Sequence, residues 1–156
     1  MNDEPASRAS FIFYLKSFHM AWICPTCKRP FKNRNQVHSC VQISPDTVLS
    51  VAGKNVQGIY NKLMAAVKKF GPYDITATPK AIFLKNPGSF VAIKPKKATL
   101  ELEFLLDTAI DEFPVYKNLR TSKNRVAHFI RLDDPSQVDM QLIQWLKLSY
   151  TLISNA

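Results

Sequence analysis

The chain has 156 residues, of which 46% are hydrophobic, and its formal net charge is +9. This length corresponds to one ordinary domain or to a small metal-binding module followed by one domain, and the hydrophobic content excludes a wholly disordered chain. The charge is concentrated in residues 1–99, which hold 15 Lys and Arg against 4 Asp and Glu, whereas residues 100–156 hold 6 against 8. A basic first part of the chain favours a polyanionic partner.

The cysteines and the first residues bear on the compartment. Three cysteines cannot all pair within one chain, and their spacing suits a metal site better than a disulfide framework, which favours a reducing environment. The apolar run at residues 11–15 is too short for a signal sequence or a membrane span. We therefore expect a cytoplasmic protein with no membrane partner. Residues 1–19 show no clear period and are treated as an extension of unclear structure.

Residues 20–43 contain all three cysteines and one of the three histidines of the chain. Cys24 and Cys27 flank a Pro-Thr turn, and His38 and Cys40 follow after a loop. Three thiolates and an imidazole at this spacing are typical of a tetrahedral zinc site, with iron as the alternative metal. Four protein ligands fill the tetrahedron, so we expect one structural zinc per chain and no open catalytic position.

Two other interpretations of these residues are less consistent with the sequence than a zinc site. Cys24, Cys27 and Cys40 could be buried free thiols beside a surface histidine, although such a cluster within 17 residues rarely arises from composition alone. A Cys-x-x-Cys redox motif of the thioredoxin type belongs at a helix N-terminus in a strand–helix–strand unit. No strand is evident before Trp22, which argues against a redox motif.

The remainder, residues 44–156, is predicted to form an α+β domain. Ser44 followed by Pro45 is a helix-start signal, and residues 55–70 carry apolar side chains at three- and four-residue spacing, which predicts an amphipathic helix. A last helix is predicted to begin at Asp134. Between the helices, turn residues separate short stretches with the pattern of antiparallel strands. The predicted strands are residues 81–85, 89–94, 99–106, 115–119 and 125–132.

The order of helix, strands and helix implies a two-layer fold, with an antiparallel sheet of four to five strands and two main helices packed on it. The predicted organisation is thus an extension at residues 1–19, a zinc-binding knuckle at residues 20–43 and an α+β domain at residues 44–156.

Several of these motifs together resemble a known family. Residues 24–27 and 35–40 resemble the head of a bacterial domain-of-unknown-function family that pairs a CPxC…NQxHSC zinc knuckle with a small α+β domain. Further similar motifs, such as Gly71-Pro72 after a helix, extend the resemblance over residues 20–152. Lys28 departs from the pattern, because Gly is usual after such a knuckle. The α+β part is also distantly similar to small bacterial domains described as frataxin-like, and the resemblance implies a fold and a metal module but no activity.

Eight basic residues are candidates for an anion-binding surface. Nucleic-acid affinity comes mostly from Lys and Arg contacts to phosphates, and nearby aromatic side chains (Trp22, Phe31 and Phe90) could stack on unpaired bases. The alternative is an ordinary solvated basic surface with these aromatic residues in the core. The candidate anion-binding residues are Lys28, Arg29, Lys32, Arg34, Lys80, Lys94, Lys96 and Lys97.

Three hypotheses for the function follow. The first is a zinc-containing protein that contacts nucleic acid or another polyanion through a basic face, and the second is a protein–protein interaction adaptor. The third is a small-ligand or metal-handling domain, or an enzyme, with a cleft near His128. This histidine lies on the apolar face of its predicted strand, which favours a core position over a site. The sequence shows no nucleophile elbow, no phosphate-binding Gly loop and no carboxylate pair at a credible spacing, so it favours a protein that is not an enzyme.

Overall fold

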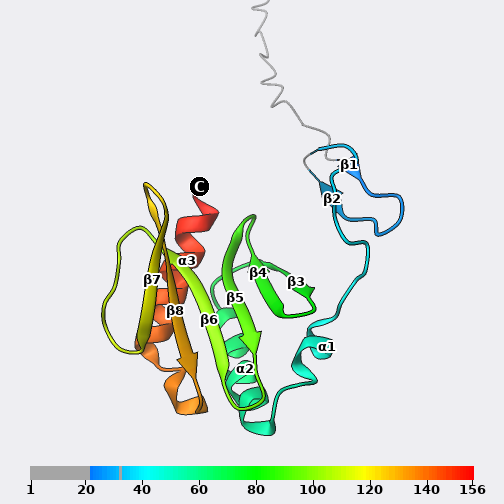
Figure 1. Cartoon of the computed structure of the whole chain (residues 1–156). Coiled ribbons are helices and arrows are strands. Elements are labelled where there is room, and N and C mark those ends of the chain that lie inside the picture. The colour runs from blue at the N-terminus through cyan, green and yellow to red at the C-terminus, as the bar shows by residue number, and fades with distance from the viewer. Residues whose placement is uncertain (1–21, 32) are drawn as a thin grey trace, which may run out of the picture. The chain divides into compact units, whose positions relative to one another are not determined.

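The computed structural model of the chain describes residues 22–31 and 33–156 (Figure 1). The predicted extension at residues 1–19 and the candidate anion-binding residue Lys32 lie outside the described residues. The chain divides into two compact units, residues 1–41 and residues 42–156. We call the described part of the first unit the metal module and the second unit the sheet domain.

The metal module contains a tight turn between two very short antiparallel strands, β1 (Trp22–Ile23) and β2 (Pro30–Phe31). The N–H of Cys24 donates to the carbonyl of Arg29 over 3.0 Å, and the N–H of Lys28 donates to the carbonyl of Cys24 over 2.9 Å. Lys28 has a φ of 60°, in the left-handed region that Gly occupies at the least cost. The backbone therefore explains why Gly suits this position better than Lys.

The sheet domain contains one six-stranded sheet in which all neighbouring strands are antiparallel. Its spatial order is β3-β4-β5-β6-β8-β7, so β8 lies between β6 and β7. The predicted α+β class is confirmed, and the sheet has one strand more than predicted, the edge strand β3, which has no buried residue. The strands are β3 (Asp74–Thr78), β4 (Ala81–Lys85), β5 (Ser89–Pro95), β6 (Leu100–Leu106), β7 (Val115–Ser122) and β8 (Arg125–Leu132).

Helices precede and follow the sheet in the chain, as predicted. Ser44 caps the first helix through its side chain. The second helix ends at Val67 rather than at the predicted Phe70. The last helix begins after its cap Asp139 rather than at the predicted Asp134, which caps a short 3-10 helix instead. The helices are α1 (Pro45–Leu49), α2 (Lys54–Val67), the 3-10 helix η1 (Pro135–Gln137) and α3 (Met140–Ser154). Within the described residues, none of them is long and apolar enough to cross a membrane.

The core lies between one face of the sheet and the helices α2 and α3, which both pack on that face (Figure 1). Alternate residues of the central strand β6 point into the core, and each helix contributes an apolar stripe. Ser149 ties α3 to the sheet, because its hydroxyl donates to the carbonyl of Phe90 over 2.7 Å and accepts from the N–H of Leu105 over 3.0 Å. Buried core residues include Val56, Ile59, Leu63, Leu100, Leu102, Phe104, Leu142 and Leu146.

The turn after α2 is held against α3 by Tyr150. Gly71 has a φ of 142°, and a Cβ at this position would lie 2.5 Å from the Tyr150 hydroxyl oxygen. That hydroxyl donates to the carbonyl of Pro72 over 3.1 Å and accepts from the side-chain amide of Asn86 over 2.7 Å. Gly71 is therefore required by the close approach of a side chain as well as by the backbone conformation.

Candidate metal centre

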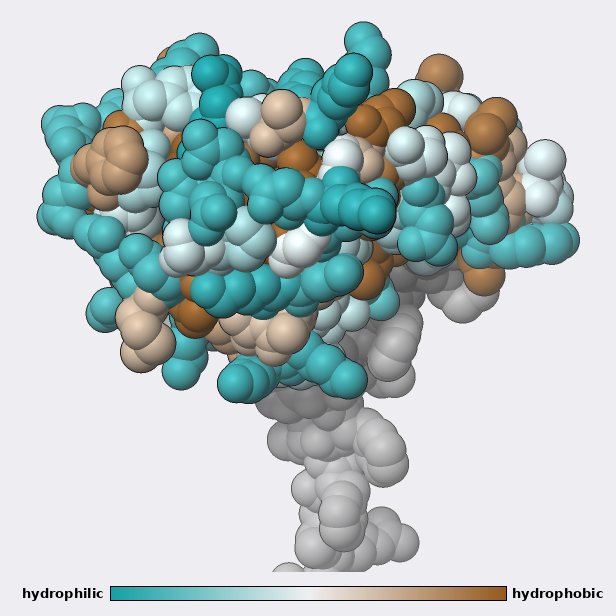
Figure 2. Space-filling view, turned by 90° about the horizontal axis from the view of Figure 1, so that it is seen from below, coloured by the Kyte–Doolittle hydropathy of each residue, from teal (hydrophilic) through white to brown (hydrophobic). Residues whose placement is uncertain are grey.

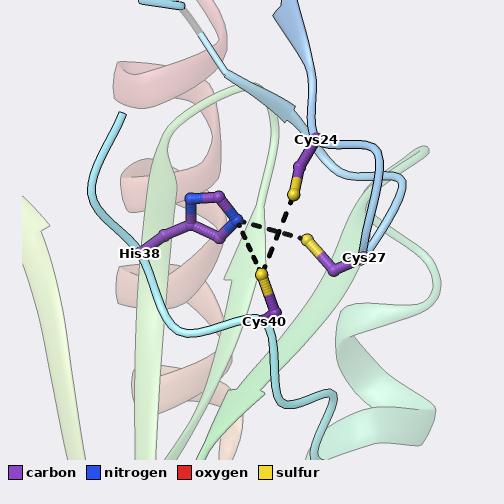
Figure 3. Close-up of side chains that lie close together, drawn as sticks. All are labelled: Cys24, Cys27, His38 and Cys40. Atoms are coloured by element: carbon purple, nitrogen blue, oxygen red, sulfur yellow. Dashed lines mark hydrogen bonds between the residues drawn. The ribbon is translucent and has the colours of Figure 1, made fainter. Parts of the chain in front are cut away.

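The structure brings the four predicted metal ligands together in one cluster. The ligand atoms of Cys24, Cys27, His38 and Cys40 all lie within 4.8 Å of one another, close enough to hold a metal ion (Figure 3). Cys24 and Cys27 are buried at the two ends of the Pro-Thr turn, whereas Cys40 is exposed. The side chains of the cluster point toward a common centre from the turn and from the later loop (Figure 3).

Three distances within the cluster match the edges of a tetrahedron around zinc. The Sγ atoms of Cys24 and Cys40 are 3.8 Å apart, and the Nε2 atom of His38 lies 3.4 Å from the Sγ atoms of both Cys27 and Cys40. With zinc–sulfur bonds of about 2.3 Å and zinc–nitrogen bonds of about 2.0 Å, tetrahedral geometry gives edges of about 3.8 Å and about 3.5 Å. The donor set therefore fits zinc in both chemistry and size.

A backbone contact determines which nitrogen of His38 faces the thiols. The Nδ1 atom lies 2.6 Å from the carbonyl oxygen of Gln36, and we assign it as the donor because a carbonyl can only accept. Nε2 then carries a free lone pair directed at the cysteines, as in zinc sites where a second partner orients the imidazole. The same hydrogen bond to Gln36 raises the pKa of His38 above its ordinary value.

Arg29 supports the cluster from outside. Its Nε donates to the Sγ of Cys27 over 3.4 Å, and its Nη2 donates to the carbonyl of Ser39. Its guanidinium carbon also lies 5.8 Å from the centroid of the Phe31 ring. The guanidinium thus links the turn to the loop that carries two of the ligands. The sequence predicted an anion-binding role for Arg29 and missed this one, because the partners are a thiol and a distant carbonyl.

Three rings pack together in the described part of the metal module. Phe31 lies against His38 with 4.0 Å between ring centroids, and Trp22 lies 5.9 Å from Phe31 and 6.1 Å from His38. These aromatic contacts restrict the orientation of the imidazole, together with the hydrogen bond to Gln36. Trp22 and Phe31, which the sequence also suggested as stacking residues for bases, therefore have structural contacts at the cluster.

The thiols of the turn are prepared for deprotonation. Hydrogen bonding from the backbone of Cys27 lowers the pKa of Cys24 to about 6, against the opposing effect of burial. For Cys27, burial raises the pKa, but hydrogen bonds from the backbone and side chain of Arg29 outweigh it and the net shift is downward. Since metals bind the thiolate form, donors placed around the sulfur atoms favour metal binding.

The candidate anion-binding residues of the sheet domain gather at one end of the sheet. Ile82 of β4 pairs with Ile93 of β5, so the β3–β4 turn with Lys80 lies at the same end as the β5–β6 turn with Lys96 and Lys97. Figure 2 views the end with the β5–β6 turn and shows mainly hydrophilic side chains, with hydrophobic ones in small separate groups.

The remaining candidates are placed differently. Lys94 lies on β5 and forms an ion pair with Glu103 over 3.0 Å, so its charge is partly neutralised. Lys28 and Arg34 are exposed residues of the metal module, which is a separate unit from the sheet domain. Phe90, predicted as a stacking residue, is buried against the rings of Tyr73 and Tyr150 and is not accessible to a base.

His128 belongs to the core rather than to a cleft. Its side chain is 0% exposed, and its ring stacks on Phe104 with 5.3 Å between centroids. Its Nε2 accepts a hydrogen bond from the N–H of Ile110 over 2.9 Å. Burial lowers the pKa of His128, which keeps the ring neutral. The structure therefore supports a core position for His128, and the hypothesis of a ligand cleft near this residue stays a prediction.

One match to known proteins accompanies this geometry. A family model described as a domain of unknown function (DUF5655) matches residues 44–153. No curated protein and no solved structure matches the chain, and the distant similarity to frataxin-like domains has no support. The matched residues lie in the sheet domain and contain none of the four metal-ligand candidates.

Proposed function

The chain belongs to the DUF5655 family through residues 44–153, and on this premise we propose that it is a zinc-containing protein that binds nucleic acid or another polyanion. The family name carries no activity, so the proposal rests on the residues of this chain. It has two parts, a structural zinc in the metal module and phosphate contacts from exposed basic residues. Each part has its own test.

The zinc part is carried by one observation, the convergence of the ligand atoms of Cys24, Cys27, His38 and Cys40 within 4.8 Å of one another, with three of their distances matching tetrahedral edges. Four protein ligands complete the coordination of zinc and leave no position for a substrate, so the metal has a structural role. Three sulfur donors and one nitrogen donor also suit iron, which is the alternative metal.

Elemental analysis of the purified full-length protein tests the zinc part. We expect one zinc per chain, with loss of the metal in Cys40→Ala and retention in Ser39→Ala. Ser39 is a suitable control because it neighbours two ligands and contributes only its carbonyl to Arg29 and its hydroxyl to the N–H of Val41. Full zinc content in Cys40→Ala would refute the ligand set, and iron in place of zinc would refute the metal.

The polyanion part is supported by exposed cations without acidic partners. Within the described residues the ion pairs are Lys94–Glu103 and Arg131–Glu101, which leave Lys80, Lys96 and Lys97 unneutralised at one end of the sheet. The first 99 residues carry an excess of 11 positive charges. Such a distribution attracts phosphates, and binding would release condensed counterions from a nucleic acid.

A salt series with single-stranded and double-stranded oligonucleotides tests the polyanion part. The logarithm of the affinity should fall linearly with the logarithm of salt concentration, and Lys96→Gln with Lys97→Gln should reduce the slope by about 1.4 to 1.8. Lys68→Gln with Lys69→Gln is the matched control, since it removes the same charge from exposed residues after α2. Absence of binding at low salt, or binding without a salt slope, would refute this part.

A protein–protein interaction adaptor is the second candidate, and two exposed apolar side chains favour it. Phe113 is 84% exposed and Met140 is 82% exposed. A hydrogen bond of 2.9 Å from the side chain of Gln141 to Glu112 brings their two segments together. Affinity capture from a nuclease-treated lysate separates the candidates. A protein partner should survive nuclease treatment and be lost in Phe113→Ser with Met140→Ser, whereas a nucleic acid should be removed.

A further inference from the structure

The face of the sheet opposite α2 and α3 carries an ordered row of side chains. Phe83 pairs with Ala92, Ala92 with Glu103, Glu103 with Phe129 and Phe129 with Lys117, which makes one straight row across β4, β5, β6, β8 and β7. The adjacent row, which includes Ile82, Ile93, Leu102 and Ile130, lies in the core beneath the helices. Because successive side chains of a strand point to opposite faces, the row from Phe83 to Lys117 lies on the other face.

No described helix of the sheet domain covers this face, and its aromatic rings are only partly buried. Phe83 and Phe129 are half-buried, and a shallow cavity of about 170 Å³ lies beside Phe83, between Ala92, Glu103 and Leu105. The small side chain of Ala92 leaves this space next to the ring. Phe83 and Phe129 are three strand spacings apart, or about 14 Å, so each ring is accessible to a separate planar group.

Cations border the rings. The Nζ of Lys94 lies 5.9 Å and that of Lys117 lies 5.4 Å from the centroid of Phe129. The guanidinium of Arg131 lies 5.3 Å from the ring of Tyr116 on the neighbouring strand. Lysine side chains are long and flexible, so they can leave a ring face that a ligand occupies and reach an anion at its edge.

The acidic residues of this face have defined partners. Glu103 accepts from Lys94, and Glu101 accepts from Arg131, each over 3.0 Å. The carboxylate of Glu103 stands between the two phenylalanines, where it repels phosphate and can accept hydrogen bonds from the N–H groups of bases. Charged residues are thus interleaved with the rings, unlike the charge-depleted centre of a protein–protein interface.

We propose that this face of the sheet binds an unpaired segment of nucleic acid, with bases stacked on Phe83 and Phe129 and phosphates contacted by Lys94 and Lys117. The inference rests on the proposed nucleic-acid function and assigns it a surface and a substrate form. Stacking on aromatic side chains requires bases that are not paired in a duplex, and it tolerates many sequences because every base has a π face. The face should therefore prefer single strands over duplexes of the same length and show little sequence preference.

Two measurements on the full-length, metal-loaded protein test the inference. Fluorescence anisotropy with a labelled, unstructured single-stranded oligonucleotide should show that Phe83→Leu and Phe129→Leu each weaken binding about tenfold, since they remove the stacking surface but keep an apolar side chain. Phe113→Leu is the matched control, because this exposed ring lies outside the row and its replacement should leave the affinity unchanged. Phe129→Tyr keeps an aromatic ring and should bind as the unmodified protein does.

The second measurement locates the contact. Amide NMR shifts on addition of the same oligonucleotide should concentrate on β4, β5, β6, β8 and β7, and the spectra also show whether each variant is folded. If Phe129→Tyr is folded but binds the oligonucleotide more weakly than the unmodified protein, the inference is contradicted. It is also contradicted if the protein binds a duplex as tightly as a single strand.

The outcomes separate this inference from the function on which it rests. The inference would be overturned if binding depended on salt but the NMR shifts were confined to the metal module and the lysine-bearing turns, with unchanged affinity in Phe83→Leu and Phe129→Leu. That result would leave the proposed function intact. Absence of binding to any oligonucleotide at low salt would overturn both.

Discussion

The metal module and the sheet domain are stabilised by different means. The sheet domain buries apolar residues from two helices and six strands in one core. In the described part of the metal module, by contrast, the buried hydrophobic residues are Cys24 and Cys27, which are ligand candidates themselves. Small units bury little apolar surface to offset their loss of chain entropy, so we expect the folding of the metal module to depend on the proposed zinc. On this proposal the two units differ in what folds them: the metal module depends on its metal, and the sheet domain depends on its apolar core.

The two tryptophans of the chain fall one in each unit, Trp22 in the metal module and Trp145 in the core of the sheet domain. Their indole N–H signals in an NMR spectrum therefore report the two units separately. Each unit can therefore be perturbed and followed on its own.

Removal of the metal has the largest expected effect. Structural zinc contributes on the order of 10 kcal/mol to the folding of a small module, so a chelator should collapse the amide signals of residues 22–41 and the Trp22 indole signal. The signals of residues 42–156, including Trp145, should keep their positions, and the urea midpoint of the sheet domain should not change. If the chelator lowered the urea midpoint of the sheet domain, the two units would unfold together and their separate stabilisation would be refuted.

A cavity in the core should destabilise the sheet domain and leave the metal module unchanged. Leu102 is fully buried on the central strand β6, and Leu102→Ala should lower the free energy of unfolding of the sheet domain by about 3 kcal/mol. Urea unfolding followed by the Trp145 signal measures the change, while elemental analysis should show unchanged zinc. Leu119→Ala on the edge strand β7 is the control, because Leu119 is 52% exposed and its truncation should cost less than about 0.5 kcal/mol. Equal losses in the two variants would argue against a core on one face of the sheet.

A smaller effect is expected on acidification. Burial lowers the pKa of His128 in the folded state, so the unfolded chain takes up a proton first as the pH falls below its ordinary pKa of about 6.5. The contribution of neutral His128 is complete above this pH and is lost below it, because protonation removes the acceptor for the N–H of Ile110. Asp111, the nearby acid that affects this group, opposes the shift only in part.

His128→Gln isolates this contribution, since a Gln oxygen can still accept from Ile110 but does not titrate in this range. Urea unfolding of the sheet domain between pH 7 and pH 5 should show a loss of stability in the unmodified protein and a smaller loss in the variant. The same slope in both proteins would refute the role of His128.

The smallest expected effect lies in the turn of the metal module. Lys28 occupies the left-handed region at a φ of 60°, which costs a residue with a Cβ about 1 kcal/mol. Lys28→Gly should therefore tighten zinc binding about fivefold in competition with a chelator. Asn35 has a φ of 55° but tolerates this region through its short polar side chain, so Asn35→Gly should have little effect. Weaker zinc binding in Lys28→Gly would show that the Lys side chain contributes more than its backbone strain costs.

Local patterns in the sequence accounted for much of the fold and for the candidate ligand set. Cys24, Cys27, His38 and Cys40 were found because their chemistry and spacing are distinctive within a short stretch, and the structure brings their ligand atoms together. The alternation in β6 and the Ser44 cap are predictable for the same reason, since both depend on neighbours in the chain. The edge strand β3 was missed because an exposed strand lacks the apolar alternation that marks a buried one.

Only the tertiary structure decided the features that join distant parts of the chain. Insertion of β8 between β6 and β7 follows from strand pairing. The same pairing aligns Phe83, Glu103 and Phe129 in one row on the face of the sheet opposite α2 and α3. The burial of His128 and the contacts of Arg29 at the metal cluster likewise depend on partners that no sequence window contains. The physical reason is that the sequence pattern of a strand indicates only which of its residues face a core. The packing of the whole domain determines which strands lie next to it, and therefore which side chains share its opposite face.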